Sequence, residues 1–187
     1  MSTLELGRRT TALVLIDLMP RIIALDTAPL SGQEVLERCT ALAEATRAVG
    51  GLVVNVRVER PGVDVQPEGS GLALDAQPGD VEIVKRTVGA FHQTGLDDVL
   101  RKRGIKTVVL AGIATNFGVE STGRAADEHG YDTVYITDAM TGLDGAAHDF
   151  AVSYVFPKFG TVCSGTEYVA ALGRVSVEVA QPLPDGS

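Results

Sequence analysis

Two charged residues and one tight turn are the parts of this chain that could perform chemistry. Asp17 ends one apolar run, Lys85 ends another, and residues 113–118 form a turn after a third. A carboxylate at the end of an apolar strand is desolvated, which raises its pKa unless a cation compensates, and Lys85 is the candidate cation. The turn leads into a helix, so its backbone N–H groups point at whatever lies above the strand end. We expect a functional site here, with a structural ion pair as the alternative interpretation.

Apolar runs alternate along the sequence with segments whose apolar residues recur at helical spacing. The pattern predicts strands at 11–17, 52–58, 81–85, 107–110, 133–137 and 161–163, and helices at 33–49, 94–103, 117–129, 146–156 and 166–172. Apolar runs without alternation are typical of strands that are covered on both faces, as in parallel sheets. The order of elements therefore predicts an α/β fold: a three-layer, doubly wound, mostly parallel six-stranded sheet with helices on both faces.

This fold would bring the candidate residues together. Ligands of doubly wound sheets bind outside the carboxyl ends of the strands, where Asp17, Lys85 and residues 113–118 are all expected. The length of 187 residues fits one domain, with a core of about residues 11–172 and a polar tail at 180–187. Residues 61–79 are rich in Pro, Gly, Asp and Gln and predict a long surface loop of the kind that often serves as a lid.

Composition argues against several classes of partner. The formal net charge is −8, which disfavours nucleic acids and anionic membranes. No apolar run approaches the roughly 20 residues that a membrane span requires, and the polar start of the chain predicts no signal peptide. Cys39 and Cys163 are the only cysteines and suggest reduced structural thiols in a cytoplasmic protein. The three histidines share no metal-ligand spacing, so neither a metal nor another cofactor is expected.

Three segments together resemble the isochorismatase-like hydrolases, a family that includes nicotinamidases and carbamoyl-sarcosine amidases. They read TVVLAGIATNFGVESTGRA at 107–125, YITDA at 135–139 and KRTVGAF at 85–91, and the likeness extends over about residues 11–172. In the family an Asp, a Lys and a nucleophilic Cys form the catalytic set. Asp17 and Lys85 match the first two, but Gly118 stands in the place of the cysteine.

The resemblance also implies roles for the residues around Gly118. Family members carry a cis peptide at the position of Ile113 and Ala114, and the N–H groups of Ala114 and Gly118 would then form an anion-binding pocket. Phe117 is expected to form a wall of the pocket or to lie in the core. The zinc ligands of nicotinamidases are not matched, because the segment after the second strand contains no histidine.

Glycine in the cysteine position favours a reaction without a covalent nucleophile. True isochorismatases also carry glycine there and hydrolyse an enol ether, giving pyruvate and a dihydroxy-cyclohexadiene carboxylate. In that reaction Asp17 would be the general acid, Lys85 would balance charge and hold a substrate carboxylate, and Gly118 would leave room for the ring. Two alternatives stay open: a C–N hydrolase that activates water in place of the thiol, and a ligand-binding family member without turnover.

Other residues are candidates for the rim of the pocket. Arg57 and Arg60 would reach a substrate carboxylate, and solvated loop arginines are an equally good interpretation. His92 would border the pocket or a neighbouring subunit, or be a structural histidine. Met19 stands where family members commonly have Gln, which predicts a more apolar pocket. The resemblance further implies a homo-oligomer, a dimer or larger, with helix faces packed against each other.

Overall fold

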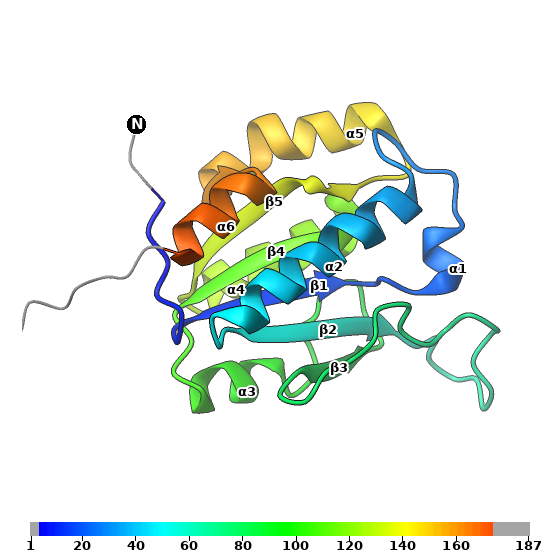
Figure 1. The fold of residues 1–187 in the computed structure, drawn as a ribbon. Coiled ribbons are helices and arrows are strands. Elements are labelled where there is room, and N and C mark those ends of the chain that lie inside the picture. The colour runs from blue at the N-terminus through cyan, green and yellow to red at the C-terminus, as the bar shows by residue number, and fades with distance from the viewer. Residues whose placement is uncertain (1–3, 174–187) are drawn as a thin grey trace, which may run out of the picture.

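A twisted sheet of six parallel strands forms the centre of the protein (Figure 1). The computed structural model describes residues 4–173, so the predicted tail at 180–187 lies outside the described residues. The strands follow the order β3-β2-β1-β4-β5-β6. They are β1 (Thr11–Ile16), β2 (Leu52–Val58), β3 (Val81–Lys85), β4 (Thr107–Ile113), β5 (Asp132–Thr141) and β6 (Thr161–Cys163). Since the winding direction changes between β1 and β4, the carboxyl ends of these two strands border the crevice where such folds bind ligands.

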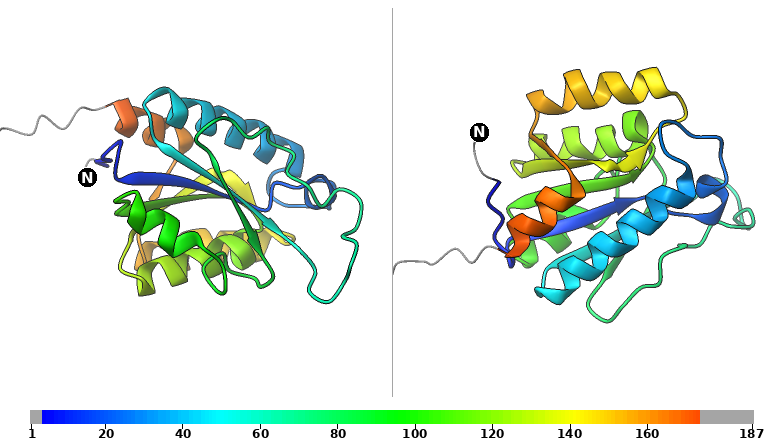
Figure 2. Two further views of the ribbon diagram at one scale, coloured as in Figure 1. Left: turned by 90° about the horizontal axis from the view of Figure 1, so that it is seen from below. Right: turned by 45° about the horizontal axis from the view of Figure 1, so that its top comes forward.

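Helices cover both faces of this sheet, as the sequence predicted (Figure 2). The long α2 (Gly32–Ala48) and α6 (Gly165–Gly173) pack on one face. The other face carries α3 (Leu96–Lys102), η1 (Thr115–Val119), α4 (Glu120–Glu128), α5 (Gly145–Phe150), η2 (Ala151–Val155) and η3 (Phe156–Lys158). A single turn, α1 (Pro20–Ile23), follows β1. The elements η1 and η2 are π-helical and continue directly into or from α-helix, so each pair forms one rod.

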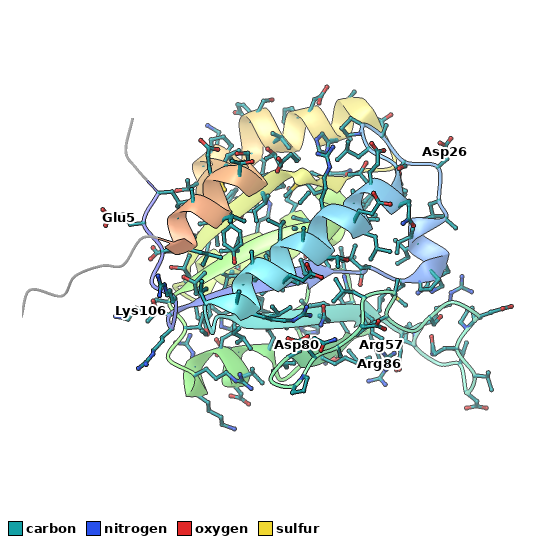
Figure 3. All side chains as sticks on the ribbon, viewed as in Figure 1. Glu5, Asp26, Arg57, Asp80, Arg86 and Lys106 are labelled. Carbon is teal, nitrogen blue, oxygen red and sulfur yellow. The ribbon has the colours of Figure 1, made fainter. Side chains whose placement is uncertain are left out.

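The alternation of side chains along β1 builds the two halves of the core. Ala12, Val14 and Ile16 face the α3–α4–α5 layer, whereas Leu13 and Leu15 face α2 and α6, and all five are buried. Side chains fill the space between the sheet and both helix layers (Figure 3). Burial on both faces explains why β1 reads as an unbroken apolar run rather than an alternating one.

The predicted elements are correct in type, and most differ only at their ends. The bounds of β2, β3 and β6 are those expected, and the sheet is parallel throughout. Strands β4 and β5 run three and four residues further than predicted, because a bulge between Leu110 and Gly112 lets them resume pairing at Met140. Ile113, expected in the turn, is therefore the last residue of β4.

The loop between β2 and β3 is anchored to the body of the protein. The N–H of Ala73 donates to the carbonyl oxygen of Leu18, and the side chain of Leu74 is buried in the core beside α2. The N–H of Arg21 donates to the carbonyl oxygen of Gly69. The loop is thus attached at its middle to the segment that follows β1. None of the helices within residues 4–173 combines the length and the apolar character that crossing a membrane would need.

We predict that Gly112→Ala destabilises the protein strongly. Gly112 has a φ of +116°, and a Cβ there would collide with the carbonyl oxygen of Ile16 on the neighbouring strand. Both effects act on the strand that carries Ile113. The free energy of unfolding, measured by urea denaturation, should therefore fall by more than about 2 kcal/mol. Gly130→Ala is the matched control, because Gly130 has a φ of +83° with no atom within 4 Å of its Cβ. Equal losses for the two variants would contradict the collision at Gly112.

Candidate active site

A cavity of about 470 Å³ opens at the carboxyl ends of β1, β3 and β4. Its floor contains Asp17, Lys85 and Gly118, the three residues that the sequence analysis placed in the catalytic set. Ile113, Ala114 and Phe117 also line it, as predicted for the turn after β4. The remaining wall comes from α1, from the start of the β2–β3 loop, from residues 86–88 and from Leu143. Residues distant in sequence therefore meet where the fold predicts a ligand site.

Asp17 and Lys85 form a buried ion pair in the floor of the cavity. The Nζ of Lys85 lies 2.8 Å from Oδ2 of Asp17 and donates a second hydrogen bond, 2.6 Å long, to the carbonyl oxygen of Val88. The Lys85 side chain is only 2% exposed. The other carboxylate oxygen of Asp17, Oδ1, is buried and has no hydrogen-bond partner among residues 4–173. One oxygen of the acid is thus held by the lysine, and the other is buried without a hydrogen-bond partner in the described part of the chain.

The backbone fixes the direction of the Asp17 carboxyl group. Asp17 has a φ of +53°, an uncommon conformation for a residue other than glycine. Its N–H donates to the carbonyl oxygen of Val56 on β2, and its own carbonyl oxygen accepts from the N–H of Met19, both over 2.8 Å. Left-handed backbone at a non-glycine residue costs about 1–3 kcal/mol and is concentrated at functional sites. The bend ends β1 one residue earlier than predicted.

Burial raises the pKa of the Asp17 carboxyl group above its ordinary value. Desolvation is the largest cause, and it outweighs the opposing effects of the Lys85 charge and hydrogen bond and of the Arg21 charge. A carboxyl group with a raised pKa is a better proton donor near neutral pH than an ordinary aspartic acid, which has a pKa of about 3.9.

Gly118 lies directly beside this ion pair. A Cβ built at position 118 would be 3.0 Å from Nζ of Lys85, 3.4 Å from Oδ2 of Asp17 and 2.8 Å from Cγ2 of Ile16. A side chain there, including a cysteine, would need the lysine or the isoleucine to shift. Gly118 therefore borders both the ion pair and the cavity, and it provides no nucleophile.

A shared hydroxyl connects the Gly118 helix to the segment after Lys85. The Oγ1 of Thr122 donates to the carbonyl oxygen of Gly118 over 2.6 Å and accepts from the N–H of Ala90 over 3.1 Å. The Thr122 side chain is fully buried. It fixes the distance between two sides of the cavity. The peptide bond between Ile113 and Ala114 is cis, as the resemblance implied.

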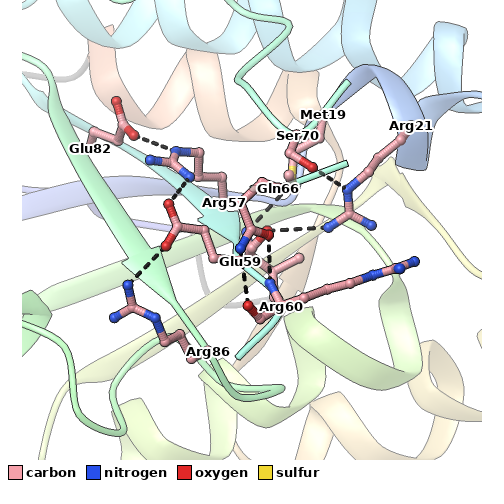
Figure 4. Close-up of polar contacts among 10 residues, drawn as sticks. Met19, Arg21, Arg57, Glu59, Arg60, Gln66, Ser70, Glu82 and Arg86 are labelled. Atoms are coloured by element: carbon pink, nitrogen blue, oxygen red, sulfur yellow. Dashed lines mark hydrogen bonds and ion pairs between the residues drawn. The ribbon is translucent and has the colours of Figure 1, made fainter. Parts of the chain in front are cut away.

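Basic side chains dominate the outer wall. Four basic residues, Arg21, Arg60, Lys85 and Arg86, and two acidic residues, Asp17 and Glu59, line the cavity. Arg21 donates to Ser70 and to the carbonyl oxygen of Val58, and Arg86 pairs with Glu59 (Figure 4). The guanidinium of Arg60 extends away from these contacts, and no side chain within residues 4–173 accepts a hydrogen bond from it.

Three residues expected at the pocket lie elsewhere. Arg57 binds Glu59 over 2.7 Å and Glu82 over 2.6 Å, and it does not line the cavity, because strand alternation points it to the opposite side from Val58. His92 is exposed and outside the cavity. Met19 is fully buried, its Sδ accepts from the N–H of Val58, and it does not line the cavity.

Several residues of the wall were not predicted from the sequence, Arg21 and Leu143 among them. Arg21 follows Asp17 by four residues, and a helical turn at Pro20 brings it back over the cavity. Leu143 reaches the cavity from the segment between β5 and α5. The spacing of Arg21 from Asp17 was a signal that could have been used, whereas nothing in the sequence around Leu143 indicates its place.

Neither cysteine can replace the missing nucleophile. Cys39 and Cys163 are buried in the core beside α2 and do not line the cavity. Burial raises the pKa of the Cys163 thiol to about 12 and that of Cys39 further still, so both remain protonated at neutral pH. Both are structural, as predicted. Within residues 4–173 no group of three His, Cys, Asp or Glu side chains is arranged to hold a metal ion.

Comparison with known proteins identifies the family of this chain. Residues 11–167 match the isochorismatase domain family. The chain is 40% identical over 188 residues to the uncharacterised isochorismatase family protein YecD of Escherichia coli O157:H7, covering 90% of this chain and 100% of YecD. The structure of an isochorismatase family protein from Burkholderia thailandensis has 39% identity and a TM-score of 0.83, covering 92% of this chain and 100% of that one. The chain therefore belongs to the isochorismatase family.

A more distant relative has a named activity. The ureidoacrylate amidohydrolase RutB of Variovorax paradoxus is 43% identical over 97 residues, which cover 51% of this chain and 38% of RutB. Family membership and this relative identify the chain as a hydrolase of the isochorismatase family.

We predict that Lys85→Met destabilises the protein more at pH 8 than at pH 5. Without its partner, the Asp17 carboxylate is a buried unpaired charge, which costs about 3–5 kcal/mol. The folded-state pKa of Asp17 then rises further above the unfolded value. The folded state binds more protons than the unfolded state between these two pKa values, so stability falls as the pH rises.

Urea denaturation at both pH values measures this effect. The double variant Asp17→Asn/Lys85→Met is the control, because it has no ionisable group in the pair and should lose the extra pH dependence. A Lys85→Met variant as stable at pH 8 as at pH 5 would show that the Asp17 carboxylate is well solvated after all.

Proposed function

We propose that this protein hydrolyses a small anionic metabolite by acid catalysis from Asp17, without a covalent intermediate. The favoured reaction is hydrolysis of the enol ether of isochorismate to pyruvate and a dihydroxy-cyclohexadiene carboxylate. The observation that carries the proposal is the floor of the cavity, where a carboxyl group with a raised pKa, paired with Lys85, lies beside Gly118. An acid is present at this floor, and a nucleophile is absent from position 118.

The charge of the cavity supports an anionic substrate. Four basic and two acidic residues line it, and a cavity with an excess of positive charge attracts and holds carboxylates. Lys85 is positioned to stabilise a carboxylate near Asp17, and Arg60 has a guanidinium without a protein partner in the described chain. The apolar residues Val88, Phe117 and Leu143 would contact the carbon skeleton.

The reaction needs one proton and one water molecule. Asp17 gives its proton to the terminal methylene carbon of the enol ether, which leaves an oxocarbenium ion. Water adds to that ion, and its released proton returns to Asp17. The resulting hemiketal collapses: the proton of its new hydroxyl group passes to the ether oxygen as the bond between that oxygen and the carbon of the new pyruvate breaks. Lys85 opposes the negative charge on Asp17 while it is deprotonated, and no step requires a thiol.

The principal alternative is hydrolysis of a C–N bond. RutB is an amidohydrolase by name, and its likeness to half of this chain supports this reading. Here Asp17 would act as a base that activates water in place of the missing thiol. A third reading is a family member that binds the ligand without turning it over. The cost of maintaining a buried ion pair with an unsatisfied oxygen is a mild argument against it.

We expect the purified protein to release pyruvate from isochorismate, and Asp17→Asn to abolish most of this activity. A general acid contributes about 10²–10⁴-fold, and the asparagine amide cannot replace the carboxylic proton. Coupling pyruvate to lactate dehydrogenase and following NADH gives the rate. Because the acid must be protonated, kcat should fall as the pH rises through the raised pKa of Asp17.

Two results would contradict the enol-ether reaction. One is no pyruvate above the rate in buffer from the correctly folded protein. The other is equal pyruvate release by the wild type and by Asp17→Asn. Turnover of ureido or amide compounds, scored by release of ammonia or amine in a parallel assay, would support the C–N alternative instead.

Arg60 and Arg57 form a matched pair of variants. Arg60→Gln should raise KM about tenfold or more with little change in kcat, because it removes a charged hydrogen bond, worth about 1.5–3 kcal/mol, to a distal carboxylate. Arg57→Gln removes the same charge three residues away but outside the cavity, so its KM should stay close to wild type. Steady-state kinetics on the same anionic substrate compares them. An equal rise in KM for both variants would contradict direct binding by Arg60, because it would show that KM depends only on the net charge of the protein.

A further inference from the structure

Arg60, a cavity residue whose guanidinium donates to no side chain within residues 4–173, is held through its backbone by Gln66. The N–H of Arg60 donates to Oε1 of Gln66 over 2.8 Å, and Nε2 of Gln66 donates to the carbonyl oxygen of Arg60 over 3.0 Å. One side-chain amide thus bonds both backbone polar groups of one residue (Figure 4). This arrangement needs an acceptor and a donor on the same planar group, which the amides of Gln and Asn provide.

The two bonds replace the sheet pairing that ends just before Arg60. Strand β2 pairs with β3 up to Val58 and Lys85, and the N–H of Glu59 donates to the carbonyl oxygen of Lys85. In an antiparallel ladder, two opposite residues exchange both of their hydrogen bonds in the way that Arg60 and Gln66 do. The Gln66 amide therefore acts as a neighbouring strand of one residue, and it fixes the direction in which the Arg60 side chain leaves the backbone.

The segment between Arg60 and Gln66 has little other support. Its two valines, Val63 and Val65, are 45% and 84% exposed. Within residues 4–173, no hydrogen bond has its donor or its acceptor in residues 61–65. The position of the Arg60 side chain at the cavity therefore depends on the amide of Gln66.

Arg60 and Lys85 place positive charge at two different parts of the cavity. Lys85 lies in the floor, where its Nζ is 2.8 Å from Oδ2 of Asp17, whereas Arg60 belongs to the outer wall. A ligand with one anionic group bonds one of these cations at a time, and a ligand with two anionic groups bonds both. A guanidinium on a fixed backbone loses less conformational entropy on binding a carboxylate than one on a loosely held loop.

We propose that Gln66 is a positioning residue: by holding the Arg60 backbone, it makes the cavity prefer ligands with two anionic groups over ligands with one. The inference rests on the anionic substrate proposed above and narrows its class to a dianion such as a dicarboxylate. It concerns binding, so its test requires no turnover. A protein that releases no pyruvate from isochorismate would refute the reaction and leave the role of Gln66 to be decided by binding.

Isothermal titration calorimetry of the full chain with dicarboxylates from succinate to adipate tests this role. Each dicarboxylate is compared with the monocarboxylate that has the same number of carbons. The wild type should bind at least one dicarboxylate about tenfold or more tightly than its monocarboxylate, because a second charged hydrogen bond forms. Gln66→Met keeps the length of the side chain but not its hydrogen bonds. It should weaken dicarboxylate binding about threefold to tenfold and leave monocarboxylate binding unchanged.

Gln77→Met is the matched control for this substitution. Gln77 is exposed on the same loop, and its side chain makes no hydrogen bond within residues 4–173, so both classes of ligand should bind as they do to the wild type. Circular dichroism and a thermal melt establish that each variant is folded.

The double variant Arg60→Gln/Gln66→Met separates positioning from a general loosening of the loop. If Gln66 acts through Arg60, Gln66→Met should have no further effect on dicarboxylate binding once Arg60 is replaced. A purely structural role would lower binding by the same factor in both backgrounds. Three results would each overturn the proposal: a wild type without preference for dicarboxylates, a Gln66→Met variant that binds them as the wild type does, or equal losses in both backgrounds.

Discussion

The buried contact between Asp17 and Lys85 determines most of what this site can do. Removing two opposite charges from water is costly, and their attraction offsets that cost only when the geometry is good. Here the lysine is held by the carbonyl oxygen of Val88 as well as by the carboxylate, and the aspartate is held by a left-handed backbone bonded to β2. The parallel sheet supplies this geometry, because β1 and β3 end at the same edge with only β2 between them.

Glycine at position 118 makes this ion pair compatible with an open cavity. A side chain at 118 would displace either Ile16 or the lysine that compensates Asp17, so the residue type and the position of the pair are linked. The same carboxylate would serve as a base beside a thiol, whereas beside glycine its available role is to exchange a proton with the substrate or with water. The change from cysteine to glycine thus concerns the direction of proton transfer as well as the loss of a nucleophile.

The sequence was sufficient for the fold and for the floor of the cavity, because strong local signals specify both. Unbroken apolar runs located β1 and β4, and Asp17 and Lys85 each stood at the end of such a run. The residues that form the wall of the cavity were harder to predict. Arg57 and Val58 are neighbours, yet only Val58 lines the cavity, because successive side chains of a strand point to opposite faces and the apolar run does not indicate which face borders the site. The bulge at Leu110 and Gly112 and the place of Leu143 depend on long-range pairing that no local pattern encodes.

An acid site without a covalent intermediate depends strongly on how water is admitted. The proposed reaction consumes one water molecule, but bulk water at Asp17 would reduce the desolvation that raises its pKa. In the single chain, Phe117 and Leu143 at the mouth are half-exposed, so the apolar rim is incomplete. The basic residues Arg21, Arg60 and Arg86 line the same cavity and would attract an anionic substrate. The proposed chemistry thus places two demands on the same cavity: charged residues that attract the anion, and apolar residues that limit the amount of water at Asp17.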